Sequence, residues 1–282
     1  MDPGQPRLRT IQPMGYEHLE VVVDGAVATL WLNRPEKLNA MSQDMWDDIP
    51  NAVADLDADP EVRCVIVAGR GPAFTVGIDL DLLAGLESRD GSPAEQSRRL
   101  YALIRRFQET NNCLANSSKP TIAAVHGYCL GEGISMITAC DLRLATNDSL
   151  ISIRETRVGL VADVGVLQRL PSIIGSGHTA ELALTGKDID GERAGAIGLV
   201  NHLYPDQKSM MDGARELAGQ IAAASPLVVS GVKSVLAANR GRDLDQALDY
   251  VARWNAAHLL SDDLREGIAA IAEKRQPAFK GT

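Results

Sequence analysis

The chain has 282 residues, of which 45% are hydrophobic, 23% are charged and 4% are aromatic. This length corresponds to about two domains or one large one, and it buries a sizeable core without disulfides or metals. The 28 basic and 37 acidic residues leave a net charge of −9, which argues against nucleic acid or an anionic membrane as the main partner.

The cysteine and histidine patterns carry no metal or disulfide signal. The four cysteines form no CxxC pair, which favours a reducing compartment, and the five histidines match no metal-ligand spacing. No apolar run reaches the roughly 18 residues that span a bilayer. The acidic net charge and the lack of a recognisable targeting segment make the cytoplasm the expected location.

The N-terminal part begins with a predicted tail and a hairpin. Residues 1–15 contain three prolines and no apolar stretch, so we expect a flexible tail. Residues 20–33 predict a β-hairpin that turns at Asp24-Gly25. A helix from about Ser42 to Asp57 should follow, with Ser42 as its N-cap.

The middle of the chain alternates strand and helix patterns. Residues 64–69 and 121–127 are short apolar runs, as expected for strands buried on both faces. A helix is predicted between them at 92–115, and 142–153 predicts two short strands around Asn147-Asp148. This alternation predicts an α/β fold with crossover connections.

From about Pro205 the pattern becomes entirely helical. We therefore divide the chain into a core over 16–205 and a helical region over 206–282. The predicted helices of that region occupy 208–224, 227–239, 243–260 and 262–274.

Two segments follow the same plan. Residues 64–80 and 121–137 each run from a buried strand through a glycine-rich loop into a helix. The first main-chain N–H groups of a helix lack partners and favour negative charge. Two such amides that converge would form an oxyanion hole, whereas the simpler interpretation is that the glycines only form tight turns.

Other glycine motifs are weaker. Residues 175–180 nearly match a dinucleotide-binding fingerprint, but they follow a helical pattern, so a helix-linking turn is the better interpretation. The sequence contains no GxSxG elbow, so a hydrolase nucleophile is not apparent.

Glu155 and Asp163 are carboxylates in apolar surroundings. A carboxyl group in an apolar cleft has a raised pKa and can exchange protons near neutral pH. Two simpler roles stay open: Asp163 as the N-cap of the helix that follows, and Glu155 as an ion-pair partner of Arg154 or Arg157.

Several motifs, in this order and spacing, resemble the crotonase superfamily, which includes enoyl-CoA hydratases and isomerases. The resemblance covers nearly all of the chain after the first 15 or so residues. It implies a crotonase-like spiral of ββα units with a C-terminal helical trimerisation region, and a homotrimer or homohexamer. The motifs are NRPEKLNAMS (33–42), AFTVGIDL (73–80), KPTIAAVHGYCLGEG (119–133), CDLRLAT (140–146) and EKRQPAFKG (273–281).

Within the superfamily, RETRVGLVADVGVLQRLPSIIG (154–175) resembles the Δ3,5-Δ2,4-dienoyl-CoA isomerases. That resemblance assigns proton transfer to Glu155 and Asp163, and it places the oxyanion-hole N–H groups at Ile78 and Glu132. It also implies contacts with coenzyme A from the segments that contain Arg34, Lys37, Phe279 and Lys280.

Two positions depart from the pattern of these relatives. Ser135 stands where the dienoyl-CoA isomerases have an aspartate and the hydratases a glutamate, and a serine is no useful acid or base at neutral pH without an activating partner. Glu132 replaces the middle glycine of a Gly-Gly-Gly run. Its carboxyl group either opposes the developing negative charge or replaces the acid missing at Ser135.

The resemblance therefore implies an acyl-CoA isomerase of fatty acid metabolism that converts 3,5-dienoyl-CoA to 2,4-dienoyl-CoA through a dienolate. The acyl-CoA thioester would bring coenzyme A with it, and no metal or other cofactor is expected. The alternatives are a 2-enoyl-CoA hydratase, a Δ3-Δ2-enoyl-CoA isomerase and, in a different class, a non-catalytic acyl-CoA-binding protein.

Overall fold

The computed structural model describes residues 8–11, 16–85 and 90–282. Its centre is a sheet with the order β1-β2-β3-β4-β5-β7-β10. These strands are β1 (Leu8–Ile11), β2 (Leu19–Asp24), β3 (Val27–Leu32), β4 (Cys64–Gly69), β5 (Thr121–Val125), β7 (Leu142–Thr146) and β10 (His202–Tyr204). A smaller sheet contains β6 (Tyr128–Leu130), β8 (Leu150–Ser152) and β9 (Ile189–Asp190).

The first strands of the large sheet are antiparallel and the rest are parallel. β2 and β3 form the predicted hairpin, with Gly25 at a positive φ of 57°. β1 pairs with β2, so residues 8–11 form an edge strand rather than a tail. The remaining residues of the predicted tail before Tyr16 lie outside the described residues. From β3 onward each pair is parallel, as helical crossovers require.

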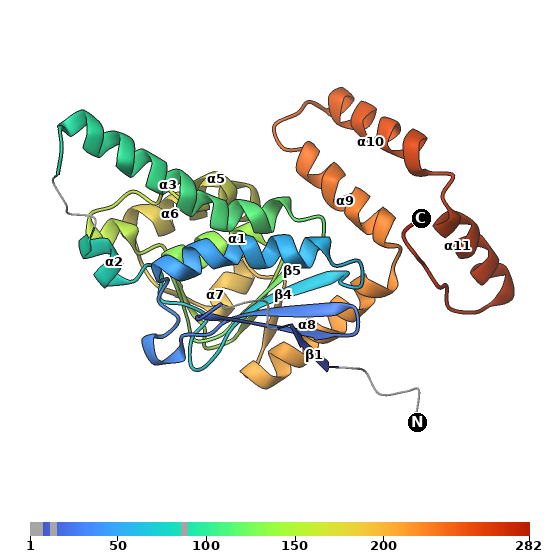
Figure 1. Ribbon diagram of the computed structural model, residues 1–282, viewed down its shortest axis with the longest axis horizontal. Helices are drawn as coiled ribbons and strands as arrows, with labels where there is room; N and C mark the ends of the chain where they lie inside the picture. Colours follow the sequence, from blue (N-terminus) through green and yellow to red (C-terminus); the bar gives the residue numbers. More distant parts are fainter. Residues whose placement is uncertain (1–7, 12–15, 86–89) are drawn as a thin grey trace.

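Helices cover both faces of the large sheet (Figure 1). α1 (Gln43–Ala58) and α3 (Pro93–Asn116) pack on one face, and α8 (Gln207–Ala223) packs on the other. The hydroxyl of Ser42 accepts a hydrogen bond from a main-chain N–H of α1, as predicted. Ser92 and Glu95 form a capping box that fixes the start of α3.

The spiral arises because consecutive strands enter different sheets. β5 belongs to the large sheet and β6 to the small one, and α4 (Glu132–Ala139) follows. β7 and β8 repeat this division, so the two strands predicted within 142–153 exist but do not share a sheet. The first strand–loop–helix segment runs from β4 into α2 (Leu80–Gly85). The short η1 (Pro35–Lys37) lies earlier in the chain, before α1.

The next part of the chain is mainly helical. It contains η2 (Glu155–Val158), α5 (Val166–Arg169), α6 (Pro171–Thr185) and α7 (Gly191–Ala196). Gly175 breaks α6 with a φ of 79°, so the weak dinucleotide-like motif is a bend between helical segments, as predicted.

The last helices extend away from the sheets (Figure 1). They are α9 (Pro226–Ala238), α10 (Leu244–His258) and α11 (Asp262–Glu273). Together with α8 they match the four predicted helices. The exposed apolar side chains of α9, α10 and α11 include Val232, Leu236, Leu244, Leu248, Ile268 and Ile271. Within the described residues, no single helix has the length and apolarity to cross a membrane, and only the pair α8 and α9, bent by 106°, passes that test together.

Candidate active site

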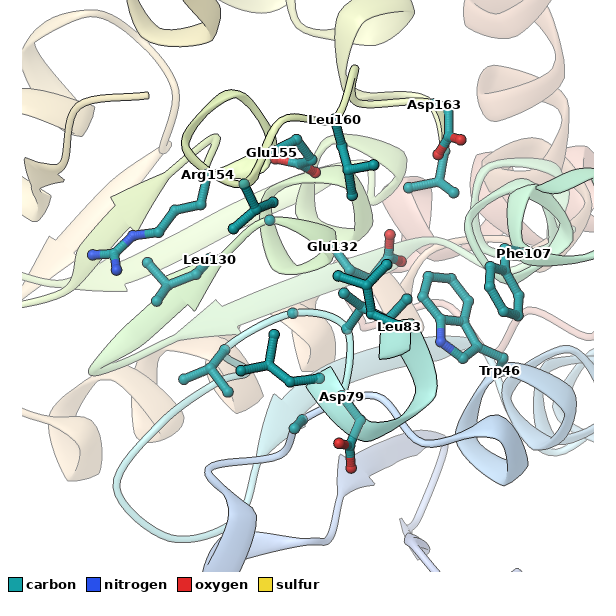
Figure 2. A pocket seen from close by; sticks show the side chains of 18 of the residues that line it. Trp46, Asp79, Leu83, Phe107, Leu130, Glu132, Arg154, Glu155, Leu160 and Asp163 are labelled. Atoms are coloured by element: carbon teal, nitrogen blue, oxygen red, sulfur yellow. The ribbon is translucent and has the colours of Figure 1, made fainter. Parts of the chain in front are cut away.

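A cavity of about 670 Å³ opens beside the two glycine-rich loops (Figure 2). This volume lies in the range of small-molecule sites. Most of its wall is apolar, and the stacked rings of Trp46 and Phe107, 4.3 Å apart, form one side. The carboxyl groups of Glu132, Glu155 and Asp163 line the same cavity.

The two glycine-rich loops meet at this cavity. The Leu130 N–H donates to the Thr75 carbonyl oxygen at 3.0 Å, which joins the loops directly. A Cβ atom at Gly77, where φ is 89°, would lie 2.9 Å from the Leu130 carbonyl oxygen and 3.3 Å from the Glu132 nitrogen. Only glycine permits this approach.

The main-chain N–H groups of Ile78 and Glu132 have no acceptor within the described part of the chain. Ile78 follows Gly77, and its neighbours Gly77 and Asp79 bond to Met41 instead. Glu132 is the first residue of α4, so no earlier helical carbonyl is available to it. Two free amides at adjoining loops are the geometry that an oxyanion hole requires.

Glu155 begins η2 and faces the second of these loops. Its Oε1 lies 3.7 Å from the position of a Cβ atom built on Gly131, and its buried Oε2 has no hydrogen-bond partner. Burial raises the pKa of this carboxyl, and the charge of Asp163 adds to the increase. Arg154 and Arg157 pair with Asp188, so the predicted alternative of an ion pair with Glu155 is wrong.

Asp163 lies at an accessible part of the cavity wall. The alternative role as an N-cap is wrong, because Gly165 occupies that position of α5 and no side chain caps the helix. Two side chains of α3 fix the local backbone instead: Gln108 donates to the Asp163 carbonyl oxygen at 2.6 Å, and Asn111 donates to that of Val164 at 3.0 Å. Partial desolvation raises the pKa of the Asp163 carboxyl.

Glu132 places a carboxyl group at the base of the cavity with only 4% of the residue exposed. Burial raises its pKa well above the ordinary value of a glutamate. The side chain of Asn111 lies near enough to oppose this increase, although neither Glu132 oxygen has a hydrogen bond of good geometry. Ser135, one turn further along α4, is fully buried and does not line the cavity.

The four residues implied to contact coenzyme A are not brought together. Lys37 lines the cavity, but the Arg34 guanidinium is paired with Asp79 and donates to the Ala40 carbonyl oxygen at 3.1 Å. Phe279 and Lys280 lie elsewhere, against α11.

Hydrogen bonds between side chains and the main chain hold that C-terminal segment. Arg63 donates to the Phe279 carbonyl oxygen at 2.9 Å, and the Lys280 N–H donates to Asp263 at 2.8 Å. The apolar wall of Trp46 and Phe107 was not predicted as part of the site. The possible metal ligands Glu17, His18 and Asp44 lie within 4.8 Å of one another but do not line the cavity.

Comparison with known proteins identifies the family. The sequence profile described as Enoyl-CoA hydratase/isomerase matches residues 23–282. The chain belongs to the enoyl-CoA hydratase/isomerase family. It is therefore an enzyme of the crotonase type, as the motifs predict, and an acyl-CoA thioester substrate is consistent with the family.

Individual relatives resemble the chain along most of its length. It is 43% identical to the mitochondrial Δ(3,5)-Δ(2,4)-dienoyl-CoA isomerase of Dictyostelium discoideum, over 94% of this chain and 91% of that protein. It is 40% identical to the peroxisomal dienoyl-CoA isomerase of Arabidopsis thaliana, over 94% and 97% of the two chains. The crystal structure of enoyl-CoA hydratase from Mycobacterium tuberculosis H37Rv superposes with a TM-score of 0.82 at 32% identity, over 94% and 99%.

The expectation of a cytoplasmic location is wrong when judged by these relatives, whose names place them in mitochondria or peroxisomes. That expectation used the acidic net charge and the lack of a recognised targeting segment. Neither observation specifies a compartment, because organelle addresses are read by receptors rather than set by overall charge.

Proposed function

We propose that this pocket isomerises 3,5-dienoyl-CoA to 2,4-dienoyl-CoA. The observation that carries the proposal is the combination, on one apolar cavity, of two unpaired main-chain N–H groups with the carboxyl groups of Glu155 and Asp163. The names of the relatives from Dictyostelium and Arabidopsis support this choice within the family.

The geometry suggests an order of steps. The amides of Ile78 and Glu132 hold the thioester oxygen and stabilise its negative charge as it develops. Glu155, which lies against Gly131, removes a proton from the carbon next to the thioester. The resulting dienolate carries its charge along the conjugated chain, and Asp163 serves its far end by supplying a proton there.

Desolvation favours proton removal by Glu155 and proton delivery by Asp163. Burial raises the pKa values of both carboxyl groups, which favours proton exchange with the substrate by each of them. We propose that no separate cofactor takes part, because every step uses a proton transfer or a hydrogen bond that the chain provides.

Ultraviolet absorbance tests the proposal directly. Purified protein is mixed with 3,5-dienoyl-CoA and, in parallel, with 2-enoyl-CoA. We expect the absorbance of the conjugated 2,4-diene to grow in the first reaction. Loss of enoyl absorbance without diene isomerisation would transfer the assignment to a hydratase. Acyl-CoA binding with no turnover of either substrate would identify a non-catalytic binding protein.

Substitutions connect that activity with the two carboxyl groups. Glu155→Gln and Asp163→Asn should each lower kcat by about 10²- to 10⁴-fold, because each removes a group that transfers a proton. Acyl-CoA binding, measured by calorimetry, should persist. Glu192→Gln, which removes an exposed carboxyl on α7, is the matched control and should keep the activity of the unmodified protein. Unmodified turnover by both pocket variants would refute the assigned roles.

We further propose a homotrimer or homohexamer. The apolar side chains exposed on α9, α10 and α11 form a surface of the kind that another chain covers. Phe279 and Lys280 do not line the cavity of their own chain, so a second copy would have to present them to it. Light scattering after size-exclusion chromatography should give a trimeric or hexameric mass, and a monomer at assay concentration would contradict the assembly.

A further inference from the structure

Glu132 carries a carboxyl group that the proposed reaction has not yet used. The residue contributes its main-chain N–H to the candidate oxyanion hole, and its side chain also lines the cavity. Only 4% of the residue is exposed, and neither carboxyl oxygen has a hydrogen-bond partner. A buried polar group without partners is costly, so such a group in a native protein calls for an explanation.

The surroundings of this carboxyl group include charged and polar groups from four elements or loops. Burial is the largest cause of its raised pKa, and Glu155 and Asp163 add to the increase, whereas Asn111 and Arg169 oppose it. Cys129, whose thiol pKa is also raised by burial, is a further titratable neighbour. These surroundings favour the protonated form of the Glu132 carboxyl, which places no negative charge beside the forming dienolate.

Glu132 and Asp163, which line the same cavity, differ in their access to water. Asp163 is exposed, whereas Glu132 is almost completely covered. In Figure 2 the Glu132 carboxyl extends into the cavity between Asp163 and the Trp46 ring. Ser135, one turn later on α4, provides no acid.

We propose that Glu132 is a third proton-transfer residue, which delivers its proton to the far end of the dienolate and is reprotonated through Asp163. This inference rests on the proposed isomerase activity and refines the role of Asp163 from direct donor to the group that connects Glu132 with solvent. It also explains how the site functions with a serine at position 135.

The proton balance of the relay is complete. Glu155 takes the proton from the carbon next to the thioester and later releases it to water. The Glu132 O–H bond breaks as the new C–H bond forms at the far carbon. Asp163 then passes a proton to the Glu132 carboxylate and takes another from solvent, so no oxidant, reductant or further reactant is required.

Rapid-mixing kinetics with 3,5-dienoyl-CoA separate the two acids. In Asp163→Asn, Glu132 still holds one proton, so we expect a burst of about one product per site followed by slow turnover. In Glu132→Gln the donor itself is missing, so we expect no burst and a fall in kcat of at least about 100-fold. Equal bursts in the two variants, or near-normal turnover by Glu132→Gln, would overturn the relay.

A conservative variant distinguishes the loss of the Glu132 carboxyl group from a general disturbance of the structure. Glu132→Asp keeps a carboxyl group, shortened by one methylene, and should turn over at least about tenfold faster than Glu132→Gln. If aspartate is no better than glutamine, the carboxyl group is not the active feature and the inference is refuted. If the unmodified protein forms no 2,4-diene at all, the proposed function fails instead, which is a distinguishable result.

Discussion

The two strand–loop–helix units that supply the candidate oxyanion hole begin alike and end differently. Every residue of β4 and of β5 is buried, and each strand leads through glycines toward the cavity. The first unit then ends in α2, which has no buried residue, whereas all eight residues of α4 in the second unit are buried. One amide is therefore carried by a peripheral segment and the other by the core.

This difference shows how each amide is held in place. Packing fixes α4, whose neighbours surround it on every side. Ile78 is only partly buried against the core, and polar contacts of the next residue help to hold it. The Asp79 N–H donates to the Met41 carbonyl oxygen at 3.1 Å, and the Asp79 carboxylate pairs with Arg34. Substitutions in the first unit should therefore alter geometry at modest cost in stability, and those in the second should alter stability most.

The largest difference in the free energy of unfolding should come from truncating one apolar side chain to alanine in α4 and one in α2. Ile134→Ala, at a fully buried position of α4, should lower the free energy of unfolding by about 2–5 kcal/mol through lost burial and a cavity. Leu80→Ala, at a position of α2 that is 70% exposed, should change it by less than about 0.5 kcal/mol. Urea unfolding measures both, and equal losses would contradict the comparison.

The contact between the two loops is tested at Gly77. Gly77→Ala places a methyl group 2.9 Å from the Leu130 carbonyl oxygen at a φ of 89°, which forces the loops apart. We expect a loss of about 100- to 1000-fold in kcat, the typical result of removing one oxyanion donor. Gly85→Ala, where no atom of the described residues lies within 4 Å of the added methyl group, is the control in the same unit. A Gly77→Ala enzyme with normal kcat would show that this contact does not shape the site.

The ion pair between Arg34 and Asp79, which helps to hold the first unit, is tested with Arg34→Ala. Hydrogen bonding to Arg34 lowers the pKa of the Asp79 carboxyl, so the ionised pair stabilises the folded state above the ordinary aspartate pKa. We expect a loss of about 1–2 kcal/mol at pH 7, because the substitution removes a hydrogen bond between charged groups. The difference between variant and unmodified protein should shrink as the pH falls below about 4. A difference that does not change with pH would exclude the pair as its cause.

The most gradual effect concerns the dependence of stability on pH at Glu132. Burial raises its pKa in the folded state, so the folded protein binds a proton that the unfolded chain releases above a pH of about 4.3. Stability should therefore decline, by at most about 1.4 kcal/mol per pH unit, as the pH rises from there toward the raised pKa. Glu132→Gln should lack this component, and parallel pH profiles for the two proteins would show that Glu132 is ionised in the folded state.

Much of the fold is predictable because local rules and tertiary packing agree. The buried strand at 64–69, the N-cap at Ser42 and the helix start at Ser92 all follow from short-range patterns. The division of 142–153 between two sheets does not, because apolar alternation indicates a strand but not which sheet it joins. The edge strand at 8–11 was missed because its partner lies outside the local sequence.

The candidate site likewise has a part that the sequence predicts and a part that it does not. Glu155, Asp163, Ile78 and Glu132 were predicted from motifs, and all four line one cavity. Their surroundings depend on contacts that are distant in sequence. Gln108 holds the backbone at Asp163 through a hydrogen bond. Asp188 forms ion pairs with Arg154 and Arg157, which lie near Glu155 in the sequence. No residue pattern near Arg34 indicates that Asp79 would pair with it.

The most direct test of the central claim is the reaction of the unmodified protein with 3,5-dienoyl-CoA in D₂O, followed by ultraviolet absorbance and by NMR of the product. Proton removal beside the thioester and proton delivery at the far end predict a 2,4-dienoyl-CoA that carries one deuterium at its far carbon. Recovery of unchanged 3,5-dienoyl-CoA while the protein still binds it, or a hydrated product, would contradict the claim.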